Sequence, residues 1–178
     1  TVANLFTGLS FSAAAVPSKY EGLELIPANL NVYATVSTLS NSIKRFFGFR
    51  QALDKAALNT YDYILLDCPP TIEGALLTNA LIITDYIIIP VGVEDTYALS
   101  GVSHLIKVAE TLRADTESNL AIMGVLLTMY DGRLNLTQQV VAEVKKYFPR
   151  KVFKTVIPRT VRLSEAPGFG QPALYYDR

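Results

Sequence analysis

An aspartate, Asp67, directly follows the apolar run of residues 63–66. A run of four apolar residues predicts a strand buried in a sheet, which places the carboxylate at the carboxyl end of that strand. A carboxylate in this position suits a magnesium ion that bridges the terminal phosphates of a nucleotide. Strands also often end in aspartate because its side chain caps the following turn. Taken alone, Asp67 favours the turn cap.

Two prolines, Pro69 and Pro70, stiffen the segment after this aspartate. Thr71 is placed to cap the next helix, with Glu73 in its first turn. A rigid connection beside a phosphate-binding carboxylate is what a nucleotide-sensing switch requires. The proline pair therefore moves the interpretation of Asp67 toward a nucleotide site.

Distinctive residues also follow three later apolar runs, at 90–95, 128–131 and 158–160. Ligands of an open α/β sheet bind outside the carboxyl ends of its strands, so we expect the chemistry in these segments. Glu94 could contact a nucleotide, whereas Asp95 or Thr96 could equally well cap the next helix. His104 falls on that helix, and we expect it to be a surface residue without a catalytic role.

The elements that position these residues alternate along the chain. Continuous apolar runs at 63–66, 86–89, 122–127 and 152–157 predict strands, and segments at 43–58, 72–82, 97–112 and 136–147 predict helices. A further short strand is expected at 23–28. Strands that are apolar on both faces and alternate with helices specify a parallel sheet covered on both sides. We therefore predict an α/β fold with a doubly wound, mostly parallel sheet.

Residues 75–93 are long and apolar enough to resemble a membrane span. Asn79, Asp85 and Pro90 interrupt this stretch, which instead predicts a short helix followed by a buried strand. The 178 residues fit one domain, and half of them are hydrophobic, which excludes a disordered chain. The single cysteine, Cys68, has no partner for an internal disulfide and fits a reducing compartment.

Charge is distributed unevenly although the formal net charge is zero. Between Arg133 and Arg162 the chain carries eight basic residues and one acid, Glu143. This local excess suggests a surface for a polyanion, although a solvated helix face with basic loops explains it equally well.

Three stretches of sequence resemble one family closely. YDYILLDCPPTIEGALLTNALIITDYIIIPV is similar to the Walker B and switch II region of ParA, Soj and MinD ATPases. MGVLLTMYDGRLNLTQQVVAEVKKYF and KVFKTVIPRTVRLSEAPGFGQP resemble the segments that follow in ParA and Soj, and the second of these favours ParA/Soj over MinD. The chain thus resembles the ParA/Soj family of chromosome- or plasmid-partitioning ATPases, within the P-loop superfamily that has a deviant Walker A motif.

The resemblance implies roles for individual residues. Asp67 matches the Walker B aspartate and would hold Mg²⁺. Met129 matches a stretch beside the adenine of ATP, Pro158 and Arg159 match the loop that closes over the base, and Arg133 and Arg162 match basic positions used on DNA. It further implies ATP-dependent dimerisation, non-specific DNA binding, a ParB-type partner, no membrane, and a cytoplasmic, nucleoid-associated location.

No glycine-rich phosphate-binding loop of the form G-x-x-x-x-G-K-[ST] occurs in the chain. In the family this loop lies on a first strand that would precede Thr1, so we expect a single, partial P-loop domain (1–178) that lacks catalytic residues and is inactive by itself. An absent central strand would also leave apolar sheet edges bare. Three alternatives stay open: a MinD-like membrane-associated positioning ATPase, an iron–sulfur carrier of the same superfamily, or a segment that serves only as an interaction module.

Overall fold

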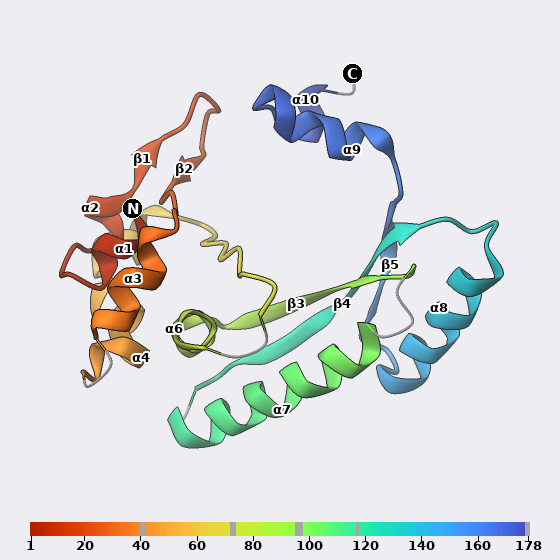
Figure 1. Cartoon of the computed structure of the whole chain (residues 1–178), viewed down its shortest axis with the longest axis horizontal. Coiled ribbons are helices and arrows are strands. Elements are labelled where there is room, and N and C mark those ends of the chain that lie inside the picture. The colour runs from red at the N-terminus through yellow and green to blue at the C-terminus, as the bar shows by residue number, and fades with distance from the viewer. Residues whose placement is uncertain (40–41, 72–73, 95–97, 117, 177–178) are drawn as a thin grey trace. The chain divides into compact units, whose positions relative to one another are not determined.

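The computed structural model describes residues 1–39, 42–71, 74–94, 98–116 and 118–176. It divides into two compact units, 1–85 with 108–120 and 86–107 with 121–178. Whether the sequence forms one partial domain therefore stays a prediction. Figure 1 shows the elements of both units.

The second unit contains a parallel three-stranded sheet with the order β3-β4-β5. Its strands are β3 (Tyr86–Gly92), β4 (Ala121–Tyr130) and β5 (Val152–Pro158). Helix α7 (Ala98–Thr116) follows β3, and helix α8 (Asn135–Tyr147) connects β4 to β5. Because β4 and β5 are parallel, α8 runs back from the carboxyl ends of the strands to their amino ends. The predicted α/β class and the three strands are confirmed.

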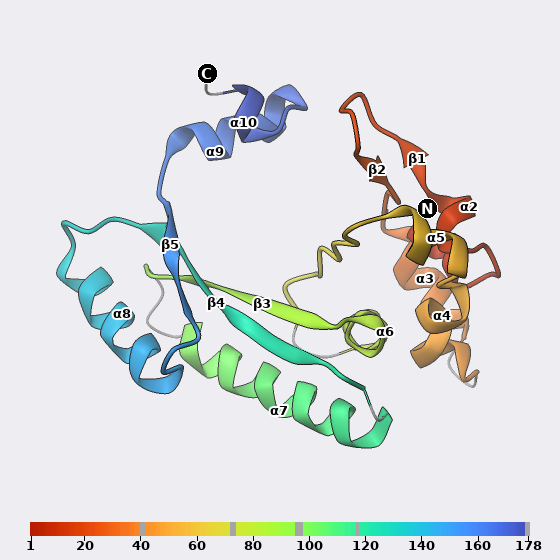
Figure 2. The ribbon, with the colours of Figure 1, turned by 180° about the vertical axis from the view of Figure 1, so that it is seen from behind.

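One face of this sheet carries the core of the unit. Ile89, Val91, Val125 and Leu127 pack there against Val102 of α7 and against α8. Figures 1 and 2 show both helices on the same side of the strands. The alternate side chains of β3 stay uncovered within this unit, with Tyr86 60% and Ile88 49% exposed. Helices thus cover one face of the sheet in this unit, whereas the sequence predicted helices on both faces.

The first unit is built from short elements. They are α1 (Val2–Leu5), α2 (Phe11–Ala14), β1 (Val16–Pro17), β2 (Glu24–Leu25), α3 (Asn31–Thr38), α4 (Lys44–Ala52), α5 (Lys55–Thr60) and α6 (Ala75–Ile83). Strands β1 and β2 form an antiparallel pair, so only two residues of the expected strand at 23–28 are in a ladder. Phe6, Phe11 and Phe49 form the aromatic centre of this unit.

The single helix expected at 43–58 is two helices, and this prediction was wrong. Asp54 separates α4 from α5 because its carboxylate accepts a hydrogen bond from the Ala57 N–H, which caps α5. The same carboxylate accepts hydrogen bonds from the Ser12 N–H at 3.3 Å and from the Ser12 hydroxyl. Asp54 therefore connects α2 to the start of α5. A continuous helix over residues 43–58 would prevent these hydrogen bonds.

The expected strand at 63–66 is also absent. No described strand pairs with these residues, and Tyr63 and Leu65 are 86% and 88% exposed. A strand exists only where a neighbour completes its hydrogen bonds, and the apolar run has no such neighbour among the described residues. Helix α6 begins at Ala75 with Gly74 as its N-cap residue, so Thr71 is not the cap that the sequence suggested. Glu73 lies outside the described residues.

Gly74 suits this position because its φ of 117° is a conformation that side chains with a Cβ rarely adopt. Helix α6 is followed by Thr84 and Asp85 and then by β3. The prediction that residues 75–93 form a short helix and a strand is therefore confirmed. Among the described residues no helix has both the length and the apolar composition to cross a membrane.

Candidate functional site

The second unit brings three of the sequence-predicted segments to one edge of its sheet. The Val93 N–H, just past β3, donates to the Thr128 carbonyl at 3.1 Å, and the Arg159 N–H, just past β5, donates to the Tyr130 carbonyl at 3.1 Å. Backbone bonds thus join the carboxyl ends of all three strands. The residues that follow them form one surface, which we call the carboxyl edge.

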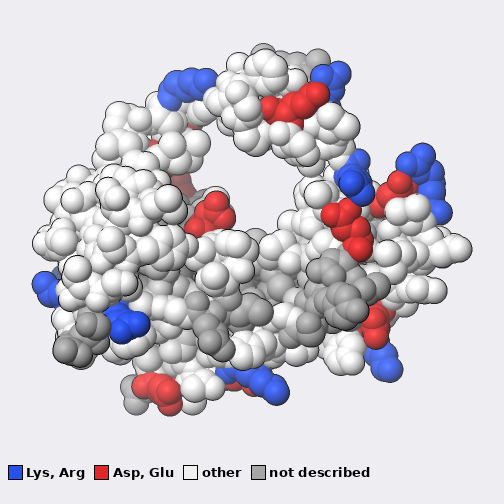
Figure 3. Space-filling model, viewed as in Figure 1, with Lys and Arg blue, Asp and Glu red and all other residues white. Residues whose placement is uncertain are grey.

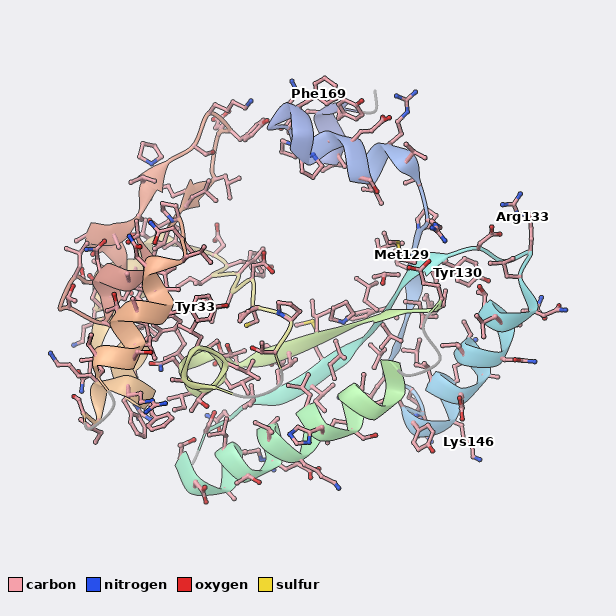
Figure 4. The ribbon with its side chains drawn as sticks, in the orientation of Figure 1. Tyr33, Met129, Tyr130, Arg133, Lys146 and Phe169 are labelled. Atoms are coloured by element: carbon pink, nitrogen blue, oxygen red, sulfur yellow. The ribbon has the colours of Figure 1, made fainter. Side chains whose placement is uncertain are left out.

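Met129 lies at the centre of the carboxyl edge (Figure 4). Its φ of 54° is left-handed, which is uncommon for a residue other than glycine, and its side chain is 41% exposed. The next residue, Tyr130, is the register partner of Pro158 in β5. Met129 and Pro158 therefore lie on neighbouring strands, so the structure brings together two of the predicted base-contacting positions.

Arg159 is held at this edge by an acid that follows β3, the strand at the opposite end of the strand order. Its Nη1 donates to Oε2 of Glu94 at 2.9 Å, so the side chain bridges from β5 past β4 to the end of β3. Sequence reasoning named both residues without pairing them, because 65 positions separate them and nothing local connects them. The residues between Glu94 and α7, which include Asp95 and Thr96, lie outside the described residues.

Arg133 forms a closed ion pair with Asp131. Its Nε donates to Oδ1 at 2.9 Å and its Nη2 donates to Oδ2 at 2.6 Å, while the Arg133 N–H donates to Oδ1 at 3.1 Å. The hydrogen bonds from Arg133 lower the pKa of the Asp131 carboxyl to about 2. The Arg133 side chain is 88% exposed, as expected for an outward-facing cation.

The acid that pairs with Arg133 lies two positions before it in the sequence. The general signal was available, because Asp and Asn side chains commonly bond to the backbone N–H two residues further on.

Arg162 belongs to the short helix α9 (Val161–Glu165), where Thr160 caps the first turn and accepts from the Arg162 N–H at 3.3 Å. Its Nη1 lies 3.7 Å from Oε2 of Glu165, which also accepts from the Tyr176 hydroxyl at 3.0 Å. The Arg162 side chain is 58% exposed. After α9 the chain forms the short helices η1 (Ala166–Phe169) and α10 (Ala173–Tyr176).

Arg133, Arg159 and Arg162, the three arginines for which the sequence predicted a ligand, thus each have an acidic partner. Figure 3 shows basic and acidic atoms side by side where the three strands end. A polyanion that binds Arg133, Arg159 or Arg162 must therefore compete with Asp131, Glu94 or Glu165. The local positive excess in the sequence overstates the charge that this edge has available.

Asp67 belongs to the first unit, and its carboxylate is exposed in a segment without helix or strand. No hydrogen bond or ion pair joins it to another described residue. The next residue, Cys68, donates from Sγ to the Leu66 carbonyl at 3.7 Å, and partial burial together with the Asp67 charge raises the pKa of its thiol. The Asp67 carboxylate is therefore free to bind a cation, beside a thiol that stays protonated at neutral pH.

A magnesium ion fits this carboxylate only with further ligands. The described residues contain no group of three or more His, Cys, Asp and Glu side chains that could hold a metal. Magnesium typically keeps several waters and binds one or two carboxylates together with substrate phosphates. Asp67 would supply the carboxylate ligand, and the remaining ligands would come from a nucleotide and from water.

His104 lies exposed on α7, as the sequence predicted for a surface histidine. Beyond the residues named from the sequence, the edge contains two that reasoning on sequence gave no role, Tyr130 and Asp131. Tyr130 supplies the carbonyl that anchors Arg159, and Asp131 orients Arg133.

Comparison with known proteins identifies the family. A family model described as an AAA domain matches residues 2–122, which is more than half of the chain. The sporulation initiation inhibitor protein Soj of Bacillus subtilis is 47% identical over 157 residues, which cover 88% of this chain and 61% of that protein. The chain belongs to the ParA/Soj family. The chromosome partitioning protein ParA of Caulobacter vibrioides is 40% identical over 165 residues, 92% of this ParA/Soj chain and 61% of the relative.

Solved structures share the fold of this chain. A cobyrinic acid a,c-diamide synthase from Mycobacterium smegmatis, with bound ATP analog and magnesium, matches at a TM-score of 0.78 and 30% identity over 90% of this chain and 62% of that one. Apo McdA from Cyanthece matches at 0.85 over 99% of this chain and 72% of its own, but at 18% identity it supports the fold alone. The ParA/Soj chain thus has a P-loop ATPase-like fold, and it spans about 61% of the length of the curated relatives.

Proposed function

We propose that this chain is part of a ParA/Soj-type ATPase that partitions chromosomes or plasmids. The observation that carries the proposal is the identity of 47% to Soj over 88% of the chain. The relatives from Bacillus subtilis, Caulobacter vibrioides and Thermus thermophilus are named Soj or ParA, which does not favour a MinD-like protein. Because the chain spans only part of these relatives, the activity belongs to the whole protein.

In this proposal Asp67 of the first unit binds the magnesium ion, as its resemblance to the Walker B aspartate implies, and residues of the carboxyl edge contact the base. Met129 contacts the base, and Pro158 and Arg159 close over it. The hydrogen bond from Arg159 to Glu94 supports this role, since it holds the guanidinium beside the ends of β3 and β4 before any ligand arrives. Such preorganisation lowers the entropy that binding must spend on ordering a long side chain.

The whole protein would dimerise when it binds ATP and then bind DNA without sequence preference. Arg133 and Arg162 would contact phosphates from the carboxyl edge, where both side chains are exposed. A ParB-type protein would stimulate hydrolysis, and the protein would work in the cytoplasm on the nucleoid. The ion pairs to Asp131 and Glu165 would have to open or shift for these contacts, which makes DNA binding by this edge weaker than the count of basic residues suggests.

The 178 residues by themselves would not hydrolyse ATP. They contain no glycine-rich loop to surround the phosphates with backbone N–H groups, and one carboxylate cannot replace it.

The proposed role of Asp67 can be tested in the full-length protein with Asp67→Ala. We expect ATP hydrolysis to fall at least a hundredfold while the fold is retained, because an exposed carboxylate without protein partners adds little to stability. The matched control is Asp62→Ala, which removes another exposed aspartate five residues earlier and should leave hydrolysis unchanged. Hydrolysis that survives in Asp67→Ala, or that declines only in proportion to the folded fraction, contradicts the proposal.

A further inference from the structure

Three helices of the first unit end at one polar cavity of about 210 Å³. Helix α4 contributes a residue of its last turn, α6 contributes its last two residues and its C-cap residue, and α7 contributes its last residue. The segment between α6 and β3 and the one between α7 and β4 complete the lining. The polar lining consists of Arg50, Thr84, Asp85, Thr116, Ser118 and Asn119.

A buried amide fixes two walls of this cavity to each other. Asn79 of α6 is 0% exposed, and its Oδ1 accepts from the Phe49 N–H of α4 at 3.0 Å. Its Nδ2 donates to the carbonyls of Arg45, also on α4, and of Ala75, each at 2.7 Å. Because Phe49 directly precedes Arg50, these bonds set the backbone of Arg50 relative to α6. The two walls are therefore positioned before a ligand arrives, which lowers the entropic cost of binding.

The cavity contains one cation and one anion, Arg50 and Asp85, that do not pair with each other. Both residues are exposed, and within the described part of the chain no hydrogen bond or ion pair joins either of them to another residue. Each charge is therefore available to a ligand.

Two hydroxyl groups of the lining can only accept a hydrogen bond from a ligand. The Thr84 hydroxyl donates to the Ala80 carbonyl at 2.7 Å, and the Thr116 hydroxyl donates to the Leu112 carbonyl at 2.6 Å. A hydroxyl has one proton, so the lone pairs of both oxygens are what remains for a ligand.

The end of α6 adds further acceptors. The helix ends at Ile83, and the carbonyls of Ile82 and Ile83 accept from no donor among the described residues. The carboxyl end of a helix also carries a partial negative charge of about half an elementary charge. Together with Asp85, these groups suit an ammonium group, which has donors only.

Donors line the same cavity. The Ser118 Oγ accepts from the Leu120 N–H at 3.2 Å, which leaves its own proton for a ligand. The Asn119 side chain has an amide NH₂ group, and Arg50 presents a planar set of N–H groups that matches the two oxygens of a carboxylate. These groups suit a carboxylate.

A ligand with a single kind of charge fits the cavity less well. An anion such as phosphate would bind Arg50 but would also face Asp85, and a polyamine would bind Asp85 but would also face Arg50. Like charges brought together oppose binding. A metal ion lacks ligands, since the described residues contain no group of three or more His, Cys, Asp and Glu side chains. The lining therefore favours a ligand that carries both charges.

We propose that this cavity binds a free amino acid, whose carboxylate contacts Arg50 and whose ammonium group contacts Asp85. The volume agrees with this size, because drug-sized ligands occupy about 300–1,000 Å³ and the cavity is smaller. Ile82 and Ile83 provide the apolar part of the lining for the side chain of the ligand. The proposal goes beyond the proposed function, since the cavity shares no residue with Asp67 or with the carboxyl edge.

The test is saturation-transfer NMR on the full-length protein with each of the common L-amino acids, followed by calorimetry on those that bind. We expect at least one amino acid to bind with a Kd of about 1 mM or below. Acetate and methylamine, which carry only one of the two charges, should bind at least about tenfold more weakly, because each leaves one charge of the cavity unpaired.

Substitutions locate the binding. Arg50→Gln and Asp85→Asn should each weaken the affinity for the amino acid about tenfold or more. Both should retain the fold in circular dichroism, because exposed side chains without partners add little to stability. The matched controls, Arg113→Gln and Asp115→Asn, make the same changes at exposed positions of α7 that do not line the cavity, and they should leave the affinity unchanged.

Three results would overturn the proposal. They are the absence of binding by every amino acid, affinity that persists in both Arg50→Gln and Asp85→Asn, and acetate or methylamine binding as tightly as the best amino acid. These outcomes are separate from the proposed function. If the amino acid binds as expected while Asp67→Ala still hydrolyses ATP, the cavity stands and the assigned role of Asp67 fails.

Discussion

At the scale of single residues, the pair Asp131 and Arg133 shows how closely the charges of the carboxyl edge are coupled. Two side-chain hydrogen bonds and one backbone hydrogen bond from Arg133 converge on one carboxylate and lower its pKa to about 2. A cation held this way is oriented before any ligand arrives. It is also partly neutralised, so its exposure overstates its attraction for a phosphate.

This coupling predicts a pH dependence. The folded-state pKa of Asp131 is below its ordinary value of 3.8, so the stability that the pair adds is complete above pH 3.8 and is lost as the pH falls toward about 2. Arg133→Gln should move the titration midpoint of Asp131 up toward 3.8, as measured by the chemical shift of its carboxyl carbon. Lys154→Gln, an exposed cation on β5, is the control and should leave the midpoint unchanged. A midpoint near 2 in Arg133→Gln contradicts the assigned cause.

Residue types could be predicted from the sequence more reliably than residue pairs. The distinctive segments after the apolar runs were found because strand ends in an α/β sheet are where ligands bind. The contact between Glu94 and Arg159 could not be found this way, since it depends on the side-by-side order of β3, β4 and β5. Nothing local in the sequence specifies that order.

At the scale of elements, the success of each prediction depended on whether the element has a partner. Strand β4 pairs with β3 on one side and β5 on the other, and all three contribute side chains to one core, so their apolar runs were sufficient evidence. The run at 63–66 has the same composition but no neighbouring strand among the described residues. The break between α4 and α5 was missed because a helical pattern continues across it, and only the capping bonds of Asp54 reveal the boundary.

Gly124 gives a test at this scale, because it lies in β4 against Lys151 and Phe153 at the start of β5. A Cβ at this position would meet the Lys151 carbonyl oxygen at 2.7 Å and the Phe153 ring at 2.9 Å. The carbonyl is backbone and accepts from the Val125 N–H, so it cannot move without loss of that bond. Gly124→Ala should therefore lower the free energy of unfolding by about 1–3 kcal/mol, as measured by urea denaturation.

Gly92, at the end of β3, is the matched control for this substitution. A Cβ there meets nothing within 4 Å, and the residue has no left-handed φ. Gly92→Ala should change stability by less than about 0.5 kcal/mol. Equal effects of the two substitutions would mean that the close approach of β4 and β5 is not what requires glycine at position 124.

At the scale of the whole molecule, the formal net charge of zero is accompanied by ion pairs at the carboxyl edge, where Arg133, Arg159 and Arg162 each face an acid. An edge of paired charges is suited to a nucleotide, which needs precise positions more than net attraction.

The phosphates of the proposed nucleotide lead to the last prediction. The 178 residues supply a carboxylate at Asp67 and base-contacting candidates at Met129 and Arg159, but no loop of backbone N–H groups for the phosphates. Most of the affinity for a triphosphate comes from such a loop and its lysine, since the charge there is largest. The chain by itself should therefore bind magnesium–ATP more weakly than about 1 mM, which corresponds to about 4 kcal/mol, and should show no turnover. Calorimetry with the folded chain, verified by circular dichroism, measures this affinity, and the full-length protein in the same buffer is the control. Micromolar binding by the chain would mean that the phosphates find another set of donors, and the assignment of the site to a longer protein would fail.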